Sequence, residues 1–184
     1  MALGALLLMG LAGAGCGSSD GGDYGGPHPD YAKALAGSPP VLAALHKQAN
    51  DLLEGGGGAY EKRIAELRGY PVVANVWASW CLPCRQEFPV LQKLSARYGK
   101  KVAFLGVNAE DSDDAAATFL REEPVPYPSY TDPDKDVLGS LGGSGLPDTA
   151  FYDSSGQLVY FKQGPYRSDA ELEADVRSYA LQGG

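Results

Sequence analysis

The sequence has few basic residues, few histidines and no long apolar segment, and each shortage excludes a class of protein. Its 184 residues carry 15 Lys and Arg against 23 Asp and Glu, without a Lys/Arg cluster, so the charge pattern of a nucleic-acid-binding protein is missing. The apolar run from Ala2 to Ala12 is shorter than the roughly 20 residues that a membrane-spanning helix needs. The only histidines, His28 and His46, do not complete a zinc-ligand pattern. One globular domain with an N-terminal tail is therefore expected.

The N-terminal residues are typical of an export signal. Residues 1–15 contain the apolar run and end in small residues, like the core and cleavage region of a signal peptide. Their end, Gly13-Ala14-Gly15-Cys16, resembles the lipobox of bacterial lipoproteins, whose cysteine is lipidated and becomes the mature N-terminus. Two features depart from that pattern, because Gly13 stands where Leu is usual and no Lys or Arg precedes Lys33. A plain cleaved signal with an incidental cysteine is the alternative.

Residues 16–38 are expected to form a flexible tether between this signal and the domain. The stretch Gly17 to Pro29 is rich in Gly, Ser, Asp and Pro and lacks apolar periodicity. Lipidation of Cys16 would anchor the domain to the membrane. The expected location is therefore extracytoplasmic, on the outer face of the bacterial cytoplasmic membrane.

The domain, residues 39–184, alternates strand patterns with helix patterns, which predicts an α/β fold. The pattern predicts strands at 71–77, 102–107, 149–153 and 157–162, and helices at 59–68, 112–122 and 135–141, with further helices after Cys84 and from Ser168. Ser168 and Glu171 have the spacing of a capping box at the start of the last helix. The apolar residues of segment 39–53 fit a helical face, whereas the family resemblance described below implies a short strand there, so both stay open.

Cys81 and Cys84 lie two residues apart where a strand gives way to a helix N-terminus. Unpaired backbone N–H groups and the helix dipole favour a thiolate at that position, so Cys81 is the expected nucleophile. Cys84, on the first helical turn, would resolve a mixed disulfide formed on Cys81. Arg85 stands where a c-type haem attachment site needs His, which excludes that class of site. A purely structural disulfide remains the alternative.

The residues around the pair resemble the thioredoxin superfamily, and in particular its exported TlpA/ResA branch of thiol–disulfide oxidoreductases. The resemblance spans roughly residues 60–181 and rests on two segments, Trp77-Ala78-Ser79-Trp80-Cys81-Leu82-Pro83-Cys84-Arg85-Gln86-Glu87-Phe88-Pro89 and Gly145-Leu146-Pro147-Asp148-Thr149-Ala150-Phe151. It implies a single thioredoxin-like domain of three layers, with helices on both sides of a central mixed sheet. It also implies that Pro147 is the cis-proline that faces the cysteines. An ordinary proline before a strand is the alternative.

The resemblance implies roles for further residues near the pair. Glu87 matches a family carboxylate that carries the proton of the second cysteine, whereas Asn75 stands where cytoplasmic thioredoxins keep an Asp. A solvent-facing Glu on a helix is the alternative for Glu87. Trp80 would shield the site and pack against substrate. Pro83 and Leu146 occupy positions that influence redox poise and substrate fit.

The expected function is extracytoplasmic reduction of protein disulfides through Cys81 and Cys84, for which one known family role is cytochrome c maturation. No cofactor beyond the Cys81–Cys84 disulfide is expected. The implied partners are protein disulfide substrates and a membrane thiol donor that keeps a monomeric protein reduced, with no nucleic acid. A disulfide-forming oxidant and a non-enzymatic copper-binding module are the alternatives.

Overall fold

The computed structural model describes Met1 and residues 27–181. The rest of the expected signal peptide and Cys16 lie outside the described residues.

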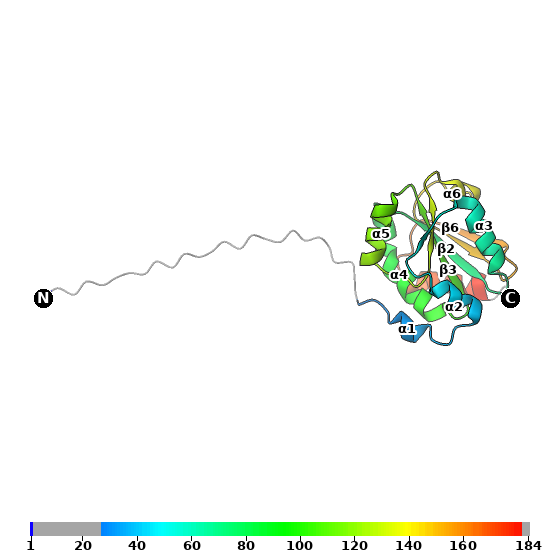
Figure 1. Cartoon of the computed structure of the whole chain (residues 1–184), viewed down its shortest axis with the longest axis horizontal. Helices are drawn as coiled ribbons and strands as arrows, with labels where there is room; N and C mark the ends of the chain where they lie inside the picture. Colours follow the sequence, from blue (N-terminus) through cyan, green and yellow to red (C-terminus); the bar gives the residue numbers. More distant parts are fainter. Residues whose placement is uncertain (2–26, 182–184) are drawn as a thin grey trace.

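A six-stranded mixed sheet forms the centre of the described part of the chain (Figure 1). Its spatial order is β1-β4-β3-β2-β5-β6. The strands are β1 Leu52–Leu53, β2 Val72–Trp77, β3 Ala103–Ala109, β4 Ser129–Asp132, β5 Asp148–Tyr152 and β6 Leu158–Gln163. The first four strands in this order pair in parallel, while β5 pairs antiparallel with both of its neighbours, β2 and β6. All residues of β2 and β3 are buried, which explains why their sequences are mostly apolar on both faces.

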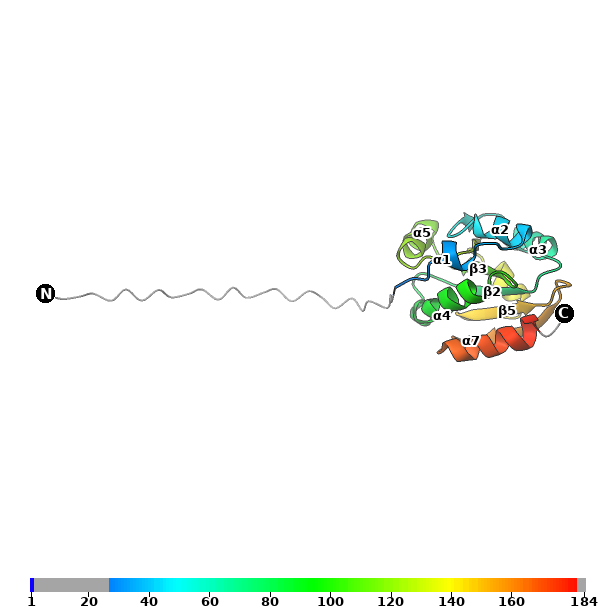
Figure 2. The same cartoon turned by 90° about the horizontal axis from the view of Figure 1, so that it is seen from below.

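Helices cover both faces of the sheet and give three layers. They are α1 Tyr31–Ala34, α2 Pro40–His46, α3 Gly56–Glu66, α4 Leu82–Tyr98, α5 Asp113–Glu122, α6 Asp136–Ser140 and α7 Asp169–Asp175, which continues as the π-helix Val176–Leu181. Residues of α4, α5 and α7 belong to one core cluster, and residues of α2, α3 and α6 belong to the other. Figure 2 shows α7 on one side of β5 and β2, with α2 and α3 on the opposite side.

The tether that we expect over residues 16–38 extends too far along the chain, because its last part belongs to the domain. Residues 31–38, which we assigned to the tether, include α1, and the Tyr31 hydroxyl donates to the Pro124 carbonyl at 2.9 Å. Leu35 is buried, and the Lys100 ammonium donates to the Ala36 carbonyl. A four-residue helix is too short to show an apolar periodicity. Only these long-range contacts therefore reveal that the segment belongs to the domain.

Most of the expected elements are present, and the ambiguous segment 39–53 contains both a helix, α2, and a strand, β1. The sequence did not predict β4, because its residues Ser129 to Asp132 are mostly polar despite their burial. At the start of α7, one of the two hydrogen bonds of the expected capping box is present. Ser168 Oγ accepts from the Glu171 N–H, but the Glu171 carboxylate accepts from the N–H of Arg167.

Candidate redox site

Cys81 is the N-cap residue of α4, and its Sγ accepts a hydrogen bond from the Cys84 N–H at 3.2 Å. Pro83 fits the first turn of the helix because its backbone has no N–H to lose. Cys81 and Cys84 form a disulfide. Cys81 keeps 4% of its surface exposed, whereas Cys84 is fully buried. Of the two cysteines, Cys81 is therefore the one with surface open to solvent.

Pro147 lies directly before β5, the strand that pairs with β2. The Leu146–Pro147 peptide bond is cis, as the family resemblance implied. Leu146 is partly buried and packs against the core cluster that contains both cysteines. Since β2 leads into the Cys81 loop, the pairing of β2 with β5 brings the two segments of the resemblance to the same end of the sheet.

Glu87 lies one helical turn beyond Cys84 and is completely buried. Its Oε1 accepts from Asn75 Nδ2 at 2.7 Å, and its Oε2 accepts from the Tyr166 N–H at 2.9 Å. Burial raises the pKa of Glu87 from 4.5 to about 7, although these two hydrogen bonds and the charge of Lys162 oppose the rise. A solvent-facing side chain, our alternative for Glu87, is wrong.

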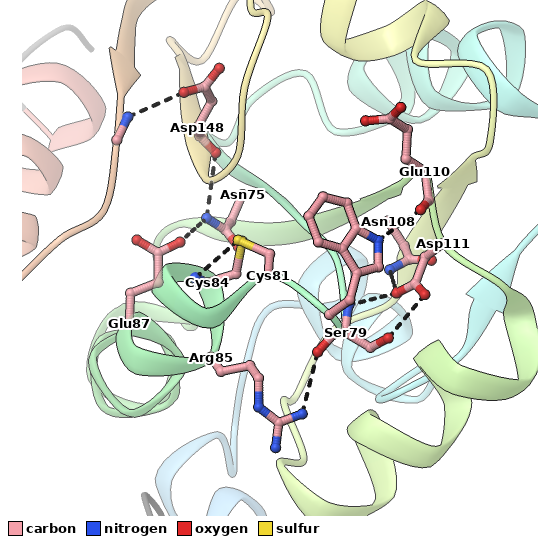
Figure 3. The surroundings of a disulfide bond; sticks show 12 residues. Asn75, Ser79, Cys81, Cys84, Arg85, Glu87, Asn108, Glu110, Asp111 and Asp148 are labelled. Atoms are coloured by element: carbon pink, nitrogen blue, oxygen red, sulfur yellow. Dashed lines mark hydrogen bonds between the residues drawn. A yellow bond between two sulfur atoms is a disulfide. The ribbon is translucent and has the colours of Figure 1, made fainter.

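Asn75 connects Glu87 to the start of β5. Its Nδ2 also lies 3.3 Å from Thr149 Oγ1 and 3.4 Å from the Asp148 carbonyl oxygen. Its Oδ1 is buried and has no hydrogen-bond partner among the described residues. Figure 3 shows Glu87, Asn75 and Asp148 together on one side of the disulfide.

The other side of the disulfide is open and partly apolar. Trp80 and Leu82, the residues that flank Cys81, are 60% and 52% exposed. The Trp80 Nε1–H donates to the Glu110 carbonyl at 2.8 Å, which fixes the indole beside the pair. A groove of about 460 Å³ runs past Trp80 and is lined by further residues that include Arg85 and Phe119.

The sequence did not reveal three contributors to this site. Tyr166 offers only its backbone N–H to Glu87, and no side-chain pattern signals that contact. Asp148 follows Pro147 and is buried, with Oδ1 accepting from the Gly164 N–H and Oδ2 unpartnered among the described residues. Burial raises the pKa of Asp148. Asp111 contacts the loop before Cys81 from 32 residues away in the sequence.

Within residues 27–181, no helix is both long and apolar enough to cross a membrane. In the same part of the chain, no three side chains of His, Cys, Asp or Glu come together as metal ligands would.

Known proteins match the chain in sequence and in structure. The family Redoxin matches residues 48–176. The thiol:disulfide interchange protein DsbE of Pseudomonas fluorescens biotype C is 43% identical over 95 residues, which are 51% of this chain and 52% of that protein. The thiol-disulfide oxidoreductase ResA of Bacillus thuringiensis (strain Al Hakam) is 29% identical over 97 residues, which are 52% of this chain and 56% of ResA.

Among solved structures, that of the MTB protein dsbF, in mixed oxidised and reduced forms, superposes with a TM-score of 0.56 at 32% identity. The match covers 61% of this chain and 82% of dsbF. The chain spans about half the length of the curated relatives it matches.

Proposed function

Because the chain belongs to the Redoxin family, we propose that it catalyses thiol–disulfide exchange through Cys81 and Cys84. The matches to DsbE, ResA and dsbF confirm the thioredoxin-like α/β fold and the resemblance to the ResA branch. The observation that carries the proposal is a disulfide at the N-terminus of α4, whose first cysteine is slightly exposed and whose second is fully buried.

The exchange starts from the reduced protein. The Cys81 thiolate attacks one sulfur of a substrate disulfide, which breaks that bond, forms a mixed disulfide and releases the other substrate sulfur as a thiolate. Cys84 then loses its proton and attacks Cys81 Sγ. The second substrate sulfur leaves and takes up a proton, and the Cys81–Cys84 disulfide forms. Two electrons pass from the protein to the substrate.

We assign to Glu87 the role of accepting the proton that Cys84 loses. Glu87 lies one turn along α4 from Cys84, on the buried side where bulk water does not reach. With a pKa of about 7 it holds and releases a proton near neutral pH, which suits a general base and acid. We assign Trp80, Pro83, Leu146 and Pro147 to the surface that receives the substrate backbone.

The direction we propose is reduction of protein disulfides, with apocytochrome c among the candidate substrates. A membrane thiol donor would return the Cys81–Cys84 disulfide to the dithiol. The protein would act as a monomer, without a dissociable cofactor. The names of the relatives, interchange protein and oxidoreductase, support exchange in either direction.

An insulin-reduction assay combined with a redox titration tests this function. We expect the wild-type protein to reduce insulin with dithiothreitol as the donor, and the Cys81→Ser variant to lose that activity. Equal turnover by wild type and variant would contradict the mechanism. A potential close to about −120 mV would instead identify an oxidant. Stoichiometric Cu(I) binding without insulin reduction would identify a copper-binding module.

We also propose that Cys16 is lipidated and anchors the domain outside the cytoplasmic membrane. The support is the sequence Gly13-Ala14-Gly15-Cys16 behind an apolar run of signal-peptide length. Cells that express the full chain and receive labelled fatty acid should label the wild type but not Cys16→Ser. Absence of label from both proteins would contradict the anchor.

A further inference from the structure

The loop between β3 and α5 holds the segment before Cys81 through one carboxylate. Asp111 Oδ2 accepts from the Ser79 N–H at 2.6 Å and from Asn108 Nδ2 at 3.0 Å, and Oδ1 accepts from Ser79 Oγ at 2.9 Å and from the Ser112 N–H at 2.9 Å. Figure 3 shows the carboxylate between Ser79 and Asn108. Each oxygen therefore accepts two hydrogen bonds, which uses the full capacity of a carboxylate.

Arg85 contacts the same serine, Ser79, at its backbone carbonyl. The guanidinium lies 4.8 Å from the Phe119 ring centre, and its Nη1 donates to the Ser79 carbonyl at 3.3 Å. The N–H, the hydroxyl and the carbonyl of Ser79 are thus all hydrogen-bonded. A residue with every polar group engaged in this way has little freedom to move.

The neighbouring residue of the loop, Glu110, holds Trp80. The Glu110 carbonyl accepts from the Trp80 indole, and Glu110 has a φ of 51°, in the left-handed region that non-glycine residues seldom adopt. Its N–H donates to the Asp132 carbonyl and its carboxylate pairs with Lys135 at 2.8 Å. Contacts on both sides therefore maintain an uncommon backbone conformation, whose carbonyl points at Trp80.

These contacts matter because Cys81 directly follows Ser79 and Trp80. Cys81 Sγ receives the Cys84 N–H only while Cys81 stays at the N-cap of α4, and that geometry favours its thiolate. A shift of the preceding loop would move Sγ away from the helix N-terminus. Asp111 does not hydrogen-bond either cysteine, so it would act through Ser79.

We propose that Asp111 is a positioning residue for disulfide exchange, which fixes Ser79 so that Cys81 and Trp80 face the substrate from the N-terminus of α4. The inference rests on the proposed function of the Cys81–Cys84 pair. It adds a residue that neither the cysteine motif nor the cis-proline segment contains.

The test compares the full-length wild type with Asp111→Asn, Ser79→Ala, the double variant and the control Asp113→Asn. Asp113 is an exposed acid in the first turn of α5, so its replacement removes the same charge without touching Ser79. The readouts are kcat and KM for insulin, and the pH midpoint at which iodoacetamide alkylates Cys81 in the reduced protein.

We expect Asp111→Asn to lower kcat by about tenfold, because small displacements of a reacting group are costly. Ser79→Ala should lower kcat about threefold, the usual effect of one lost hydrogen bond. The double variant should match Asp111→Asn to within about twofold, since the two residues act as one unit. The pH midpoint of alkylation should be higher for Asp111→Asn than for Asp113→Asn, because Cys81 Sγ moves away from the α4 N-terminus that favours its thiolate.

The inference is overturned if Asp111→Asn matches Asp113→Asn in kcat and in alkylation midpoint, or if the effects of Ser79→Ala and Asp111→Asn multiply. Should Asp111→Asn fail to fold, Ser79→Ala decides, and an unchanged kcat and midpoint in that variant overturn the inference. A wild type without insulin-reducing activity contradicts the proposed function instead. The alkylation midpoints of the same proteins then still test Asp111.

Discussion

The two sides of the Cys81–Cys84 disulfide differ in nearly every physical respect. On the inner side, Glu87 and Asn75 are buried and hydrogen-bonded to each other. On the outer side, Trp80 and Leu82 stand more than half exposed beside the slightly accessible Cys81. Under the proposed function, proton transfer would take place on the inner, buried side and substrate contact on the outer, exposed side. Substitutions on the two sides should therefore change different kinetic quantities.

The two cysteines themselves should give the largest difference. Cys81→Ser should lower insulin reduction to the uncatalysed rate, because the attacking thiolate is gone. Cys84→Ser should still attack the substrate but fail to resolve the product. Mass spectrometry should therefore find a mixed disulfide on Cys84→Ser and none on Cys81→Ser. A trapped adduct on Cys81→Ser would reverse the roles of the two sulfurs.

Glu87→Gln should give the next largest effect, confined to the resolving step. Since Glu87 must be ionised to accept the proton of Cys84, the wild-type rate of resolution should rise as pH increases through about 7, the pKa of Glu87. The glutamine variant should lack that inflection and react about a hundredfold more slowly at neutral pH, as is common when a general base is lost. Quenched-flow measurements of the mixed disulfide between pH 5 and 9 check this.

Glu61→Gln, on the exposed face of α3, is the matched control for Glu87→Gln and should keep the inflection. If Glu87→Gln kept the inflection too, the proton carrier would have to be another group.

Trp80→Ala should act on the outer side and leave the proton step intact. Loss of an aromatic contact with substrate is worth about 1.4 kcal/mol, so KM for insulin should rise about tenfold while kcat stays near the wild-type value. Leu158→Ala, an exposed apolar residue on β6, provides the control and should leave KM unchanged. A fall in kcat without a change in KM would place Trp80 in the chemistry rather than in binding.

A measurement of stability rather than of activity also tests the inner side. The pKa of Glu87 is 4.5 when exposed and about 7 in the folded protein, so the folded state binds more protons between these values. The free energy of unfolding should therefore fall as pH rises from about 4.5 to about 7, with a total loss of about 3 kcal/mol that persists at higher pH. Urea denaturation of the oxidised protein at pH 5 and pH 8 measures this loss.

Glu87→Gln should lose much less stability over the same pH range, because the amide does not ionise. The Asn75 amide can turn its free Oδ1 towards the new NH₂ group, which keeps a hydrogen bond between the two side chains. An equal pH dependence in wild type and variant would show that Glu87 is not the group that titrates.

Much of the fold was predictable because the buried strands carry their own signal. Val72 to Trp77 and Ala103 to Ala109 are mostly apolar, as is typical of strands buried on both faces, and Asn75 and Asn108 are their polar exceptions. By contrast, β4 and α1 were missed because they are short and their sequences are polar or featureless. Their positions depend on partners far along the chain, such as the Asp51 carbonyl that accepts from the Ser129 N–H and the Pro124 carbonyl that accepts from Tyr31.

The sequence by itself determined the pair of cysteines that we propose to react and its place at the start of a helix, since both follow from neighbouring residues and from the properties of thiols. Only the tertiary structure decided which groups surround the pair. Glu87 is buried because the loop with Tyr166, 79 residues away, covers it, and Ser79 is fixed because Asp111 returns to it from the end of the next strand. Burial and hydrogen bonding join distant parts of the chain, so local sequence patterns identify the sulfurs but do not set their surroundings.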